Sequence, residues 1–272
     1  MNLRAVRGGG VTKTIQRSTA LGLMAVALIA FLLGVGADAD GAQVGVADKR
    51  TVLVTGANRG LGLEFARQYA AAGWQVIGTA RRPDAATDLR ALEVRVMQLD
   101  VTDDTSVDRL VHDLANQPID LLINNAGVAM GGETFADTKF DEVERTLAVN
   151  TIGPMRVTRA LLPNLRRGKA KQIVSITSGL GSIAENEIGR FYGYRESKAA
   201  LNMFVRSLAA NLRDEGFICV VMSPGWVKTD MGGPEAPLAP SESIKGMREV
   251  IDRLTTKDTG QFWAYDGKQR KW

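Results

Sequence analysis

Short β-branched runs alternate with longer helical patterns from residue 49 onward, and this alternation constrains the fold more than any other feature. Seven short apolar runs are typical of strands, at residues 51–54, 75–79, 94–99, 120–123, 172–177, 218–222 and 262–265. Helices are expected between them, notably over residues 61–72, 140–165, 194–215 and 241–254, with Pro154 bending the second. Such alternation predicts a single doubly wound α/β domain, whose seven-stranded, mainly parallel sheet carries helices on both faces and a ligand cleft at the carboxyl ends of its strands.

Composition allows one large domain and argues against two classes of ligand. With 272 residues, 45 % of them hydrophobic, the chain can bury a full core but is too short for two large domains. Its net charge is +4, and its later basic residues form no stripe that would bind phosphates, so nucleic acid is not an expected partner. Cys219 and His112 are the only residues of their kinds, so we expect neither an intrachain disulfide nor a metal site.

A glycine-rich turn follows the first strand directly. Glycines permit positive φ angles and let the backbone approach a pyrophosphate, while the next helix offers free amides to that anion. Between a strand and a helix, this spacing predicts a dinucleotide site. Its expected contacts come from one stretch, Thr55-Gly56-Ala57-Asn58-Arg59-Gly60-Leu61-Gly62, namely Gly56, Asn58, Arg59, Gly60, Leu61 and Gly62.

The end of the second strand favours NADP(H) over NAD as the cofactor. Arg81 and Arg82 stand where a carboxylate would otherwise bind the ribose hydroxyls, and guanidinium groups suit a 2′-phosphate. Arg59 can reach the same phosphate. The alternative is that Arg81 and Arg82 are solvated loop charges.

Two further strand ends carry residues suited to the same cofactor. The carboxylate in Asp100-Val101 can accept a hydrogen bond from an adenine amino group. After the fourth strand, small residues let the backbone pass close to a ribose or adenine, and asparagines can brace the neighbouring strand. These residues are Asn124, Asn125, Ala126 and Gly127.

Tyr194 and Lys198 are four residues apart, which places both side chains on one face at the start of a helix. A phenol is a poor acid or base near neutral pH, and a nearby ammonium lowers its pKa by stabilising the phenolate. Tyr194 could then donate a proton to a carbonyl oxygen while a hydride arrives from a nicotinamide.

Other polar residues point to the same cleft. Ser178 ends the fifth strand and can hydrogen-bond a substrate oxygen, a role that Thr177 or Ser182 can also fill. Asn150 lies in mid-helix, where asparagine is unfavourable unless something uses it. Pro154 leaves the carbonyl of Asn150 without its helical donor, so an ordered water there can pass protons to Lys198.

In chain order, these motifs together resemble the short-chain dehydrogenase/reductase family over residues 50–272. The ending is similar to the sniffer and C-factor branch of carbonyl reductases. It comprises Pro224-Gly225-Trp226-Val227-Lys228-Thr229-Asp230-Met231-Gly232, then Tyr265-Asp266-Gly267 and Trp272.

That resemblance implies a Rossmann-type fold, NADP(H) and reduction of aldehydes or ketones by a Ser-Tyr-Lys triad aided by Asn. The triad would be Ser178, Tyr194 and Lys198, and Asn150 would be the assisting asparagine. Pro224, Gly225, Val227 and Thr229 would join Tyr194 and Lys198 in contacting the cofactor. The loop from Gly232 to Pro240 is shorter than the substrate lid of many relatives, and the spacing between Ser178 and Tyr194 is wider than in the shortest family members. Both departures leave the substrate's shape open.

A function from another class stays open beside the enzyme, namely a non-catalytic NADP-binding signalling or scaffold protein. The intact triad favours an enzyme acting on a small carbonyl substrate. The sequence leaves open whether the protein forms homo-oligomers.

The N-terminus has the layout of a secretory signal peptide. Four basic residues precede the uncharged stretch 18–37, and small residues follow in Ala37-Asp38-Ala39. The stretch is also long enough for a retained membrane anchor. We therefore expect residues 1–42 to be a signal peptide or anchor with the start of a linker, and residues 43–272 to be the catalytic domain. The charges favour an exported or inner-membrane-anchored enzyme, whereas an NADP(H) cofactor favours the cytoplasm.

Overall fold

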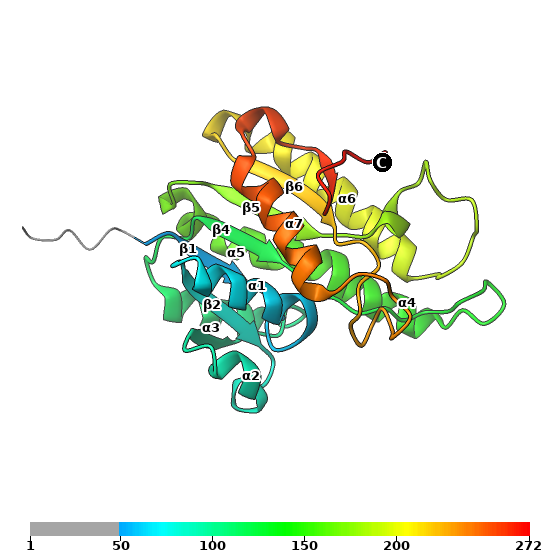
Figure 1. Cartoon of the computed structure of the whole chain (residues 1–272), viewed down its shortest axis with the longest axis horizontal. Coiled ribbons are helices and arrows are strands. Elements are labelled where there is room, and N and C mark those ends of the chain that lie inside the picture. The colour runs from blue at the N-terminus through cyan, green and yellow to red at the C-terminus, as the bar shows by residue number, and fades with distance from the viewer. Residues whose placement is uncertain (1–48) are drawn as a thin grey trace, which may run out of the picture. The chain divides into compact units, whose positions relative to one another are not determined.

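Seven parallel strands form one sheet in the order β3-β2-β1-β4-β5-β6-β7 (Figure 1). The computed structural model describes residues 49–272, so the expected signal or anchor segment, residues 1–42, lies outside the described residues. The strands are β1 (Thr51–Val54), β2 (Gln75–Ala80), β3 (Arg95–Gln98), β4 (Leu121–Asn124), β5 (Gln172–Ile176), β6 (Ile218–Ser223) and β7 (Phe262–Ala264). All seven predicted strands are present, and the sheet is entirely rather than mainly parallel.

The described part of the chain has seven α-helices. They are α1 (Gly60–Ala71), α2 (Thr87–Arg90), α3 (Asp104–Leu114), α4 (Phe140–Leu147), α5 (Gly153–Arg167), α6 (Tyr194–Asn211) and α7 (Pro240–Arg253). Of these, α1, α2 and α7 pack on one face of the sheet and α3, α5 and α6 on the other. Within residues 49–272, none of the helices is long and apolar enough to cross a membrane.

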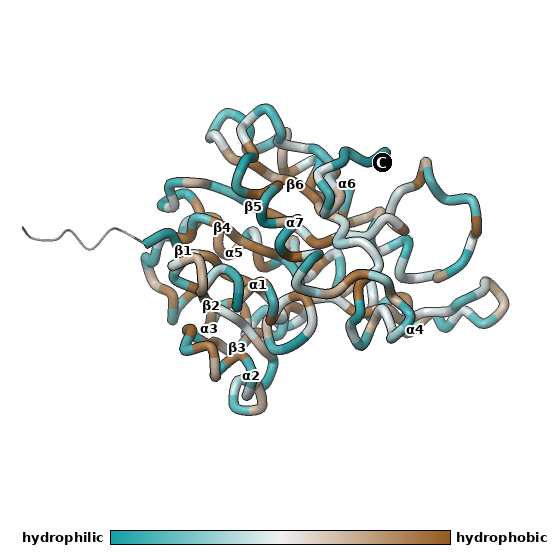
Figure 2. Tube along the Cα trace, in the orientation of Figure 1, coloured by the Kyte–Doolittle hydropathy of each residue, from teal (hydrophilic) through white to brown (hydrophobic). Residues whose placement is uncertain are grey.

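Alternate residues of each central strand belong to two separate hydrophobic cores, one on each face of the sheet. In β1, Val52 and Val54 pack with α1, α2 and α7, whereas Leu53 between them packs with α3, α5 and α6. All three side chains are fully buried. Figure 2 shows the resulting hydrophobic centre along β1, β4 and β5. A sheet buried on both faces explains why these strands read as continuous apolar runs.

The long helix expected over residues 140–165 is interrupted. α4 ends at Leu147, a π-helical turn spans Ala148–Ile152, and α5 begins at Gly153. The break adjoins Pro154, which has no N–H to donate to the preceding turn. The last expected helical turn over residues 213–215 is also separate, because α6 ends at Asn211 and a 3₁₀ turn follows.

The order in which the chain adds strands to the sheet reverses at β1, which has β2 on one side and β4 on the other. In doubly wound sheets, the crevice at the carboxyl ends of such strands binds the ligand. The topology therefore places the site beside the turn after β1 and the loop after β4.

Candidate active site

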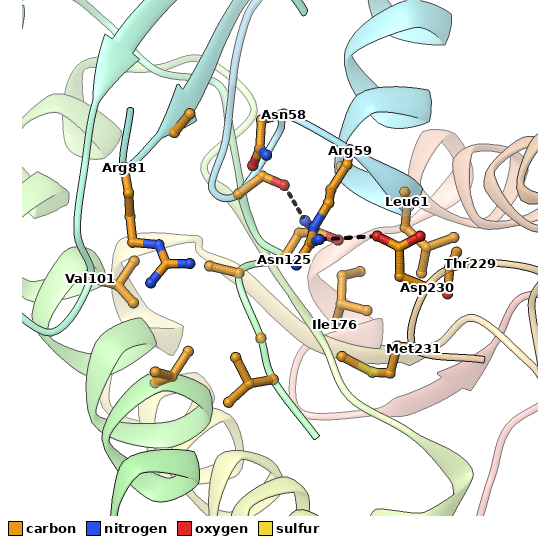
Figure 3. Close-up of a pocket in the computed structure, with 18 of the residues that line it drawn as sticks. Asn58, Arg59, Leu61, Arg81, Val101, Asn125, Ile176, Thr229, Asp230 and Met231 are labelled. Atoms are coloured by element: carbon orange, nitrogen blue, oxygen red, sulfur yellow. Dashed lines mark hydrogen bonds and ion pairs between the residues drawn. The ribbon is translucent and has the colours of Figure 1, made fainter. Parts of the chain in front are cut away.

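A cavity of about 440 Å³ lies at the carboxyl ends of β1, β2 and β4 (Figure 3). Most of the residues that the sequence predicts as cofactor contacts line this cavity. These are Gly56, Asn58, Arg59, Gly60, Leu61, Gly62, Arg81, Asp100, Val101, Ala126, Gly127, Tyr194, Lys198, Pro224 and Thr229. We call it the cofactor cavity.

The glycine-rich turn has the backbone that its sequence predicts. Gly56 and Gly60 have φ angles of +65° and +55°, a region that side chains disfavour. α1 then begins with no side-chain cap from Arg59 and no acidic residue in its first turn. The first amides of α1 are therefore left to bind an anion at the positive end of the helix dipole.

Arg59 forms an ion pair with Asp230, whereas the Arg81 side chain has no ion pair or hydrogen bond within residues 49–272. An Arg59 nitrogen lies 3.0 Å from a carboxylate oxygen of Asp230, and both side chains are more than 70 % exposed (Figure 3). The sequence predicts Arg59 as a second ligand of the 2′-phosphate, but it does not predict the ion pair with Asp230. Because an exposed ion pair is weak, a bound phosphate can compete for Arg59.

Asp100 is an ionised hydrogen-bond acceptor at the cavity wall. Burial raises the pKa of its carboxyl group, but hydrogen bonds from Thr102 and the charges of Arg81 and Arg145 lower it more, so the net shift is downward. Thr102 donates through its amide and hydroxyl groups at 2.9 and 2.6 Å. Arg145 also lines the cavity and is not among the residues that the sequence predicts there. Its helical spacing from Ala148 and Val149, which line the same cavity, was the available signal.

The two asparagines after β4 have different roles. Asn124 is buried and donates to the hydroxyl groups of Thr158 and Ser175, at 3.1 and 3.4 Å, so it does not line the cavity as expected. Asn125 lines it instead and donates to the carbonyl oxygens of Thr55 and Gly56. Successive residues of an extended chain face opposite sides, which explains why only one asparagine reaches the cavity.

Tyr194 and Lys198 both lie at the cavity from the first turns of α6. Lys198 donates to the carbonyl oxygen of Ile176 at 2.9 Å, and burial lowers its pKa to about 8. Burial raises the pKa of Tyr194, and a hydrogen bond with Ser178 opposes that rise only partly. The expected lowering of the Tyr194 pKa by Lys198 is therefore corrected, because the ammonium group is directed to a backbone oxygen.

Asn150 lies outside both cavities and acts on the backbone around them. Its side chain exchanges two hydrogen bonds of 2.8 Å with the amide and carbonyl of Val128, and donates to Ser197 at 3.0 Å. The π-helical turn thus places a fully buried asparagine between the loop after β4 and α6. This geometry favours a positioning role over direct contact with a substrate.

A second cavity of about 1040 Å³ adjoins the first and is called here the substrate cavity. Ser178 lines it, and Tyr194 lines both cavities. Gly225 and Val227, expected as cofactor contacts, line this second cavity instead. Five residues form the shared wall: Leu61, Tyr194, Pro224, Thr229 and Met231.

The alternatives to Ser178 are engaged elsewhere. Thr177 lines the cofactor cavity and donates to Asn202 at 2.7 Å. Ser182 donates to the main-chain oxygen of Trp272 and lines neither cavity. Ser178 accepts a hydrogen bond from the amide of Leu180 at 3.1 Å, which leaves its hydroxyl proton for the oxygen of Tyr194 or of a substrate.

Comparisons with known proteins agree with this geometry. The family model of the short chain dehydrogenases matches residues 50–237. The C-signal of Myxococcus xanthus is 48 % identical over 155 residues, which cover 57 % of this chain and 93 % of that protein. A 1-hydroxy-2-glutathionyl-2-methyl-3-butene dehydrogenase from Rhodococcus is 33 % identical, over 82 % of this chain and 99 % of the relative.

Solved structures share the fold over the same region. The carbonyl reductase Sniffer of Drosophila melanogaster is 33 % identical, with a TM-score of 0.77 over 82 % of this chain and 100 % of that one. An NADPH-bound carbonyl reductase from chicken fatty liver is 35 % identical, with a TM-score of 0.77 over 82 % and 99 %. The chain therefore belongs to the short-chain dehydrogenase family of oxidoreductases.

Proposed function

We propose that the protein is an NADP(H)-linked carbonyl reductase that converts aldehydes or ketones to alcohols. The observation that carries this proposal is the position of Tyr194, which lines both the cofactor cavity and the substrate cavity. A proton donor on the shared wall can reach a substrate atom that faces the cofactor.

The residues of the cofactor cavity fit NADP(H). The glycine-rich turn and the uncapped start of α1 suit its pyrophosphate, and the Asp100 carboxylate suits its adenine amino group. Arg81 lines the cavity, and no ion pair or hydrogen bond of its side chain is present in residues 49–272, so its charge suits the 2′-phosphate. The NADPH-bound chicken reductase supports the same choice.

The chain's own residues handle the proton at the carbonyl oxygen. When bound, NADPH supplies the hydride that adds to the carbonyl carbon. Tyr194 donates its phenolic proton to the carbonyl oxygen, and Ser178 donates a hydrogen bond to the same oxygen. Lys198 donates one N–H to Ile176 and has two further N–H groups for the cofactor. Asn150 holds the loop and helix that carry this arrangement.

NADPH oxidation by the purified full-length protein tests the proposal, measured over a panel of aldehydes, ketones and quinones. We expect substrate-dependent oxidation that Tyr194→Phe abolishes. The likeness to the Myxococcus C-signal supports a second candidate, a non-catalytic NADP-binding signalling or scaffold protein. Tight NADPH binding with no turnover across the panel would favour that second function.

A further inference from the structure

We propose that the ion pair between Arg270 and Glu185 makes the substrate cavity selective for uncharged carbonyl compounds, by neutralising the arginine next to Ser178. This inference rests on the proposed reductase function and names its substrate class. Both residues line the substrate cavity, although they are 85 positions apart in the chain.

Arg270 reaches the cavity from the segment after β7. Its amide donates to the carbonyl of Phe262 at 2.8 Å, which holds the backbone beside the last strand. Its guanidinium group packs against Gly179, the residue after Ser178. A Cβ atom at position 179 would lie 2.9 Å from the Arg270 Nη2 atom, so glycine makes room for the charge there.

Glu185 is held opposite this guanidinium group by the same segment. The amide of Ala184 donates to the main-chain oxygen of Trp272 at 2.8 Å, and the amide of Glu185 donates to Ser182 at 3.2 Å. About one third of each side chain of the pair is exposed. The pair is therefore shielded more than a surface ion pair, which strengthens its attraction.

Both arginines that line the substrate cavity in the described part of the chain have hydrogen-bond partners, and Arg270 alone of the two is paired with a carboxylate. Arg195 is buried and donates to the carbonyl oxygens of Arg190 and Leu180. Arg270 is paired with Glu185. Of the other two carboxylates, Glu133 pairs with Arg190, and Glu187 has no ion pair within residues 49–272.

An anionic substrate is therefore disfavoured at this wall. Among residues 49–272, the cavity's two arginines are already bound to other groups, and such a substrate would also meet the negative charge of Glu187. An uncharged carbonyl compound meets no such penalty and can use the apolar side chains of the cavity, among them Phe191, Tyr192 and Trp226.

Glu185→Gln tests the inference because it removes the partner's charge and frees that of Arg270. The probes are benzaldehyde and 4-carboxybenzaldehyde, which differ by one carboxylate. The measured quantity is the ratio of their kcat/KM values with NADPH, for the full-length protein. We expect Glu185→Gln to raise the ratio of the anionic to the neutral aldehyde by at least about tenfold, because the freed guanidinium attracts a carboxylate.

Two further variants make the result specific. Arg270→Gln leaves Glu185 unpaired, so the ratio should fall below that of the wild type. Glu215→Gln is the matched control, since it breaks an ion pair with Arg166 that lines neither cavity and should leave the ratio unchanged. If Arg270→Gln does not fold, the Glu185→Gln ratio still decides the matter.

The failures of the two proposals can be told apart. If Glu185→Gln leaves the ratio within twofold of the wild type while benzaldehyde is reduced, the inference about charge selectivity is overturned and the reductase function stands. If wild-type protein reduces no carbonyl compound in the panel, both fall together.

Discussion

The Lys198 Nζ atom lies 5.7 Å from the centre of the Tyr194 ring and donates its hydrogen bond to Ile176 instead. Within residues 49–272 the ammonium group has one backbone acceptor and no carboxylate partner, and burial lowers its pKa to about 8 from an ordinary 10.5. Such a group lowers the stability of the fold at neutral pH, because the unfolded chain solvates the charge better.

Lys198→Met should therefore raise the melting temperature at pH 7 and have less effect at pH 10. The sign follows from linkage: between the folded pKa of about 8 and the unfolded value of 10.5, the unfolded state binds more protons, so wild-type stability rises with pH. The upper limit of the gain is roughly 3 kcal/mol. Thermal melts at the two pH values provide the measurement, and an equal shift at both would contradict the explanation.

The same variant should weaken NADPH binding, since Lys198 lines the cofactor cavity with two free donors. Fluorescence titration with NADPH measures the dissociation constant. An unchanged constant would limit Lys198 to the proton-transfer step.

Tyr194→Phe should lower the kcat for carbonyl reduction by about 10²- to 10⁴-fold, because the ring stays while the transferable proton is lost. NADPH affinity should change little. Steady-state kinetics and a binding titration separate the two effects. Tyr192→Phe is a matched control, because Tyr192 lines the substrate cavity only. Activity within tenfold of the wild type in Tyr194→Phe would remove Tyr194 from the mechanism.

Arg81→Asp should shift the cofactor preference from NADPH toward NADH. The change removes an attraction to the 2′-phosphate and supplies an acceptor for the ribose hydroxyl. The ratio of kcat/KM values for the two cofactors measures the shift. Equal use of both cofactors by the wild-type protein would already argue against Arg81 as the phosphate ligand.

Asp230→Asn should tighten NADPH binding modestly, by severalfold at most. It releases Arg59 from an exposed ion pair, and exposed pairs contribute about 1 kcal/mol or less. Because Arg59 would then act on the 2′-phosphate, NADH binding should not change. Titrations with the two cofactors at low and moderate salt check this, and an equal gain for both would place the effect of Asp230 elsewhere.

Local spacing made much of this site predictable from the sequence. The glycine turn and the Tyr194–Lys198 pair lie within single strand-to-helix or helical segments, so short-range geometry determines where they face. The seven strands were equally readable, because a sheet buried on both faces requires continuous apolar runs.

Contacts between segments that are far apart in the chain could not be predicted from the sequence. The Arg59–Asp230 and Glu185–Arg270 pairs join positions 171 and 85 residues apart. The upward shift of the Tyr194 pKa depends on burial and on where Lys198 donates, and neither follows from the i, i+4 spacing. Asn125 lines the cavity in place of the predicted Asn124. Which of the two does so depends on the last residue of β4, and a sequence pattern locates a strand end only to within a residue or two.

The final prediction concerns residues 1–42, which we propose to be a targeting segment. Basic residues, an uncharged apolar stretch and Ala37-Asp38-Ala39 follow one another in the order of a signal peptide, and the apolar stretch is also long enough for an anchor. The family match begins at residue 50, and both cavities are lined by residues from position 56 onward, so the proposed reaction does not draw on this segment.

Removing residues 1–42 should therefore preserve NADPH oxidation but abolish membrane association or export. Cell fractionation of both forms, with N-terminal sequencing of the full-length product, separates cleavage near Ala39 from a retained anchor. A full-length product that stays in the cytoplasm with residues 1–42 attached would refute the proposal, and an internal start without export would show that translation begins downstream.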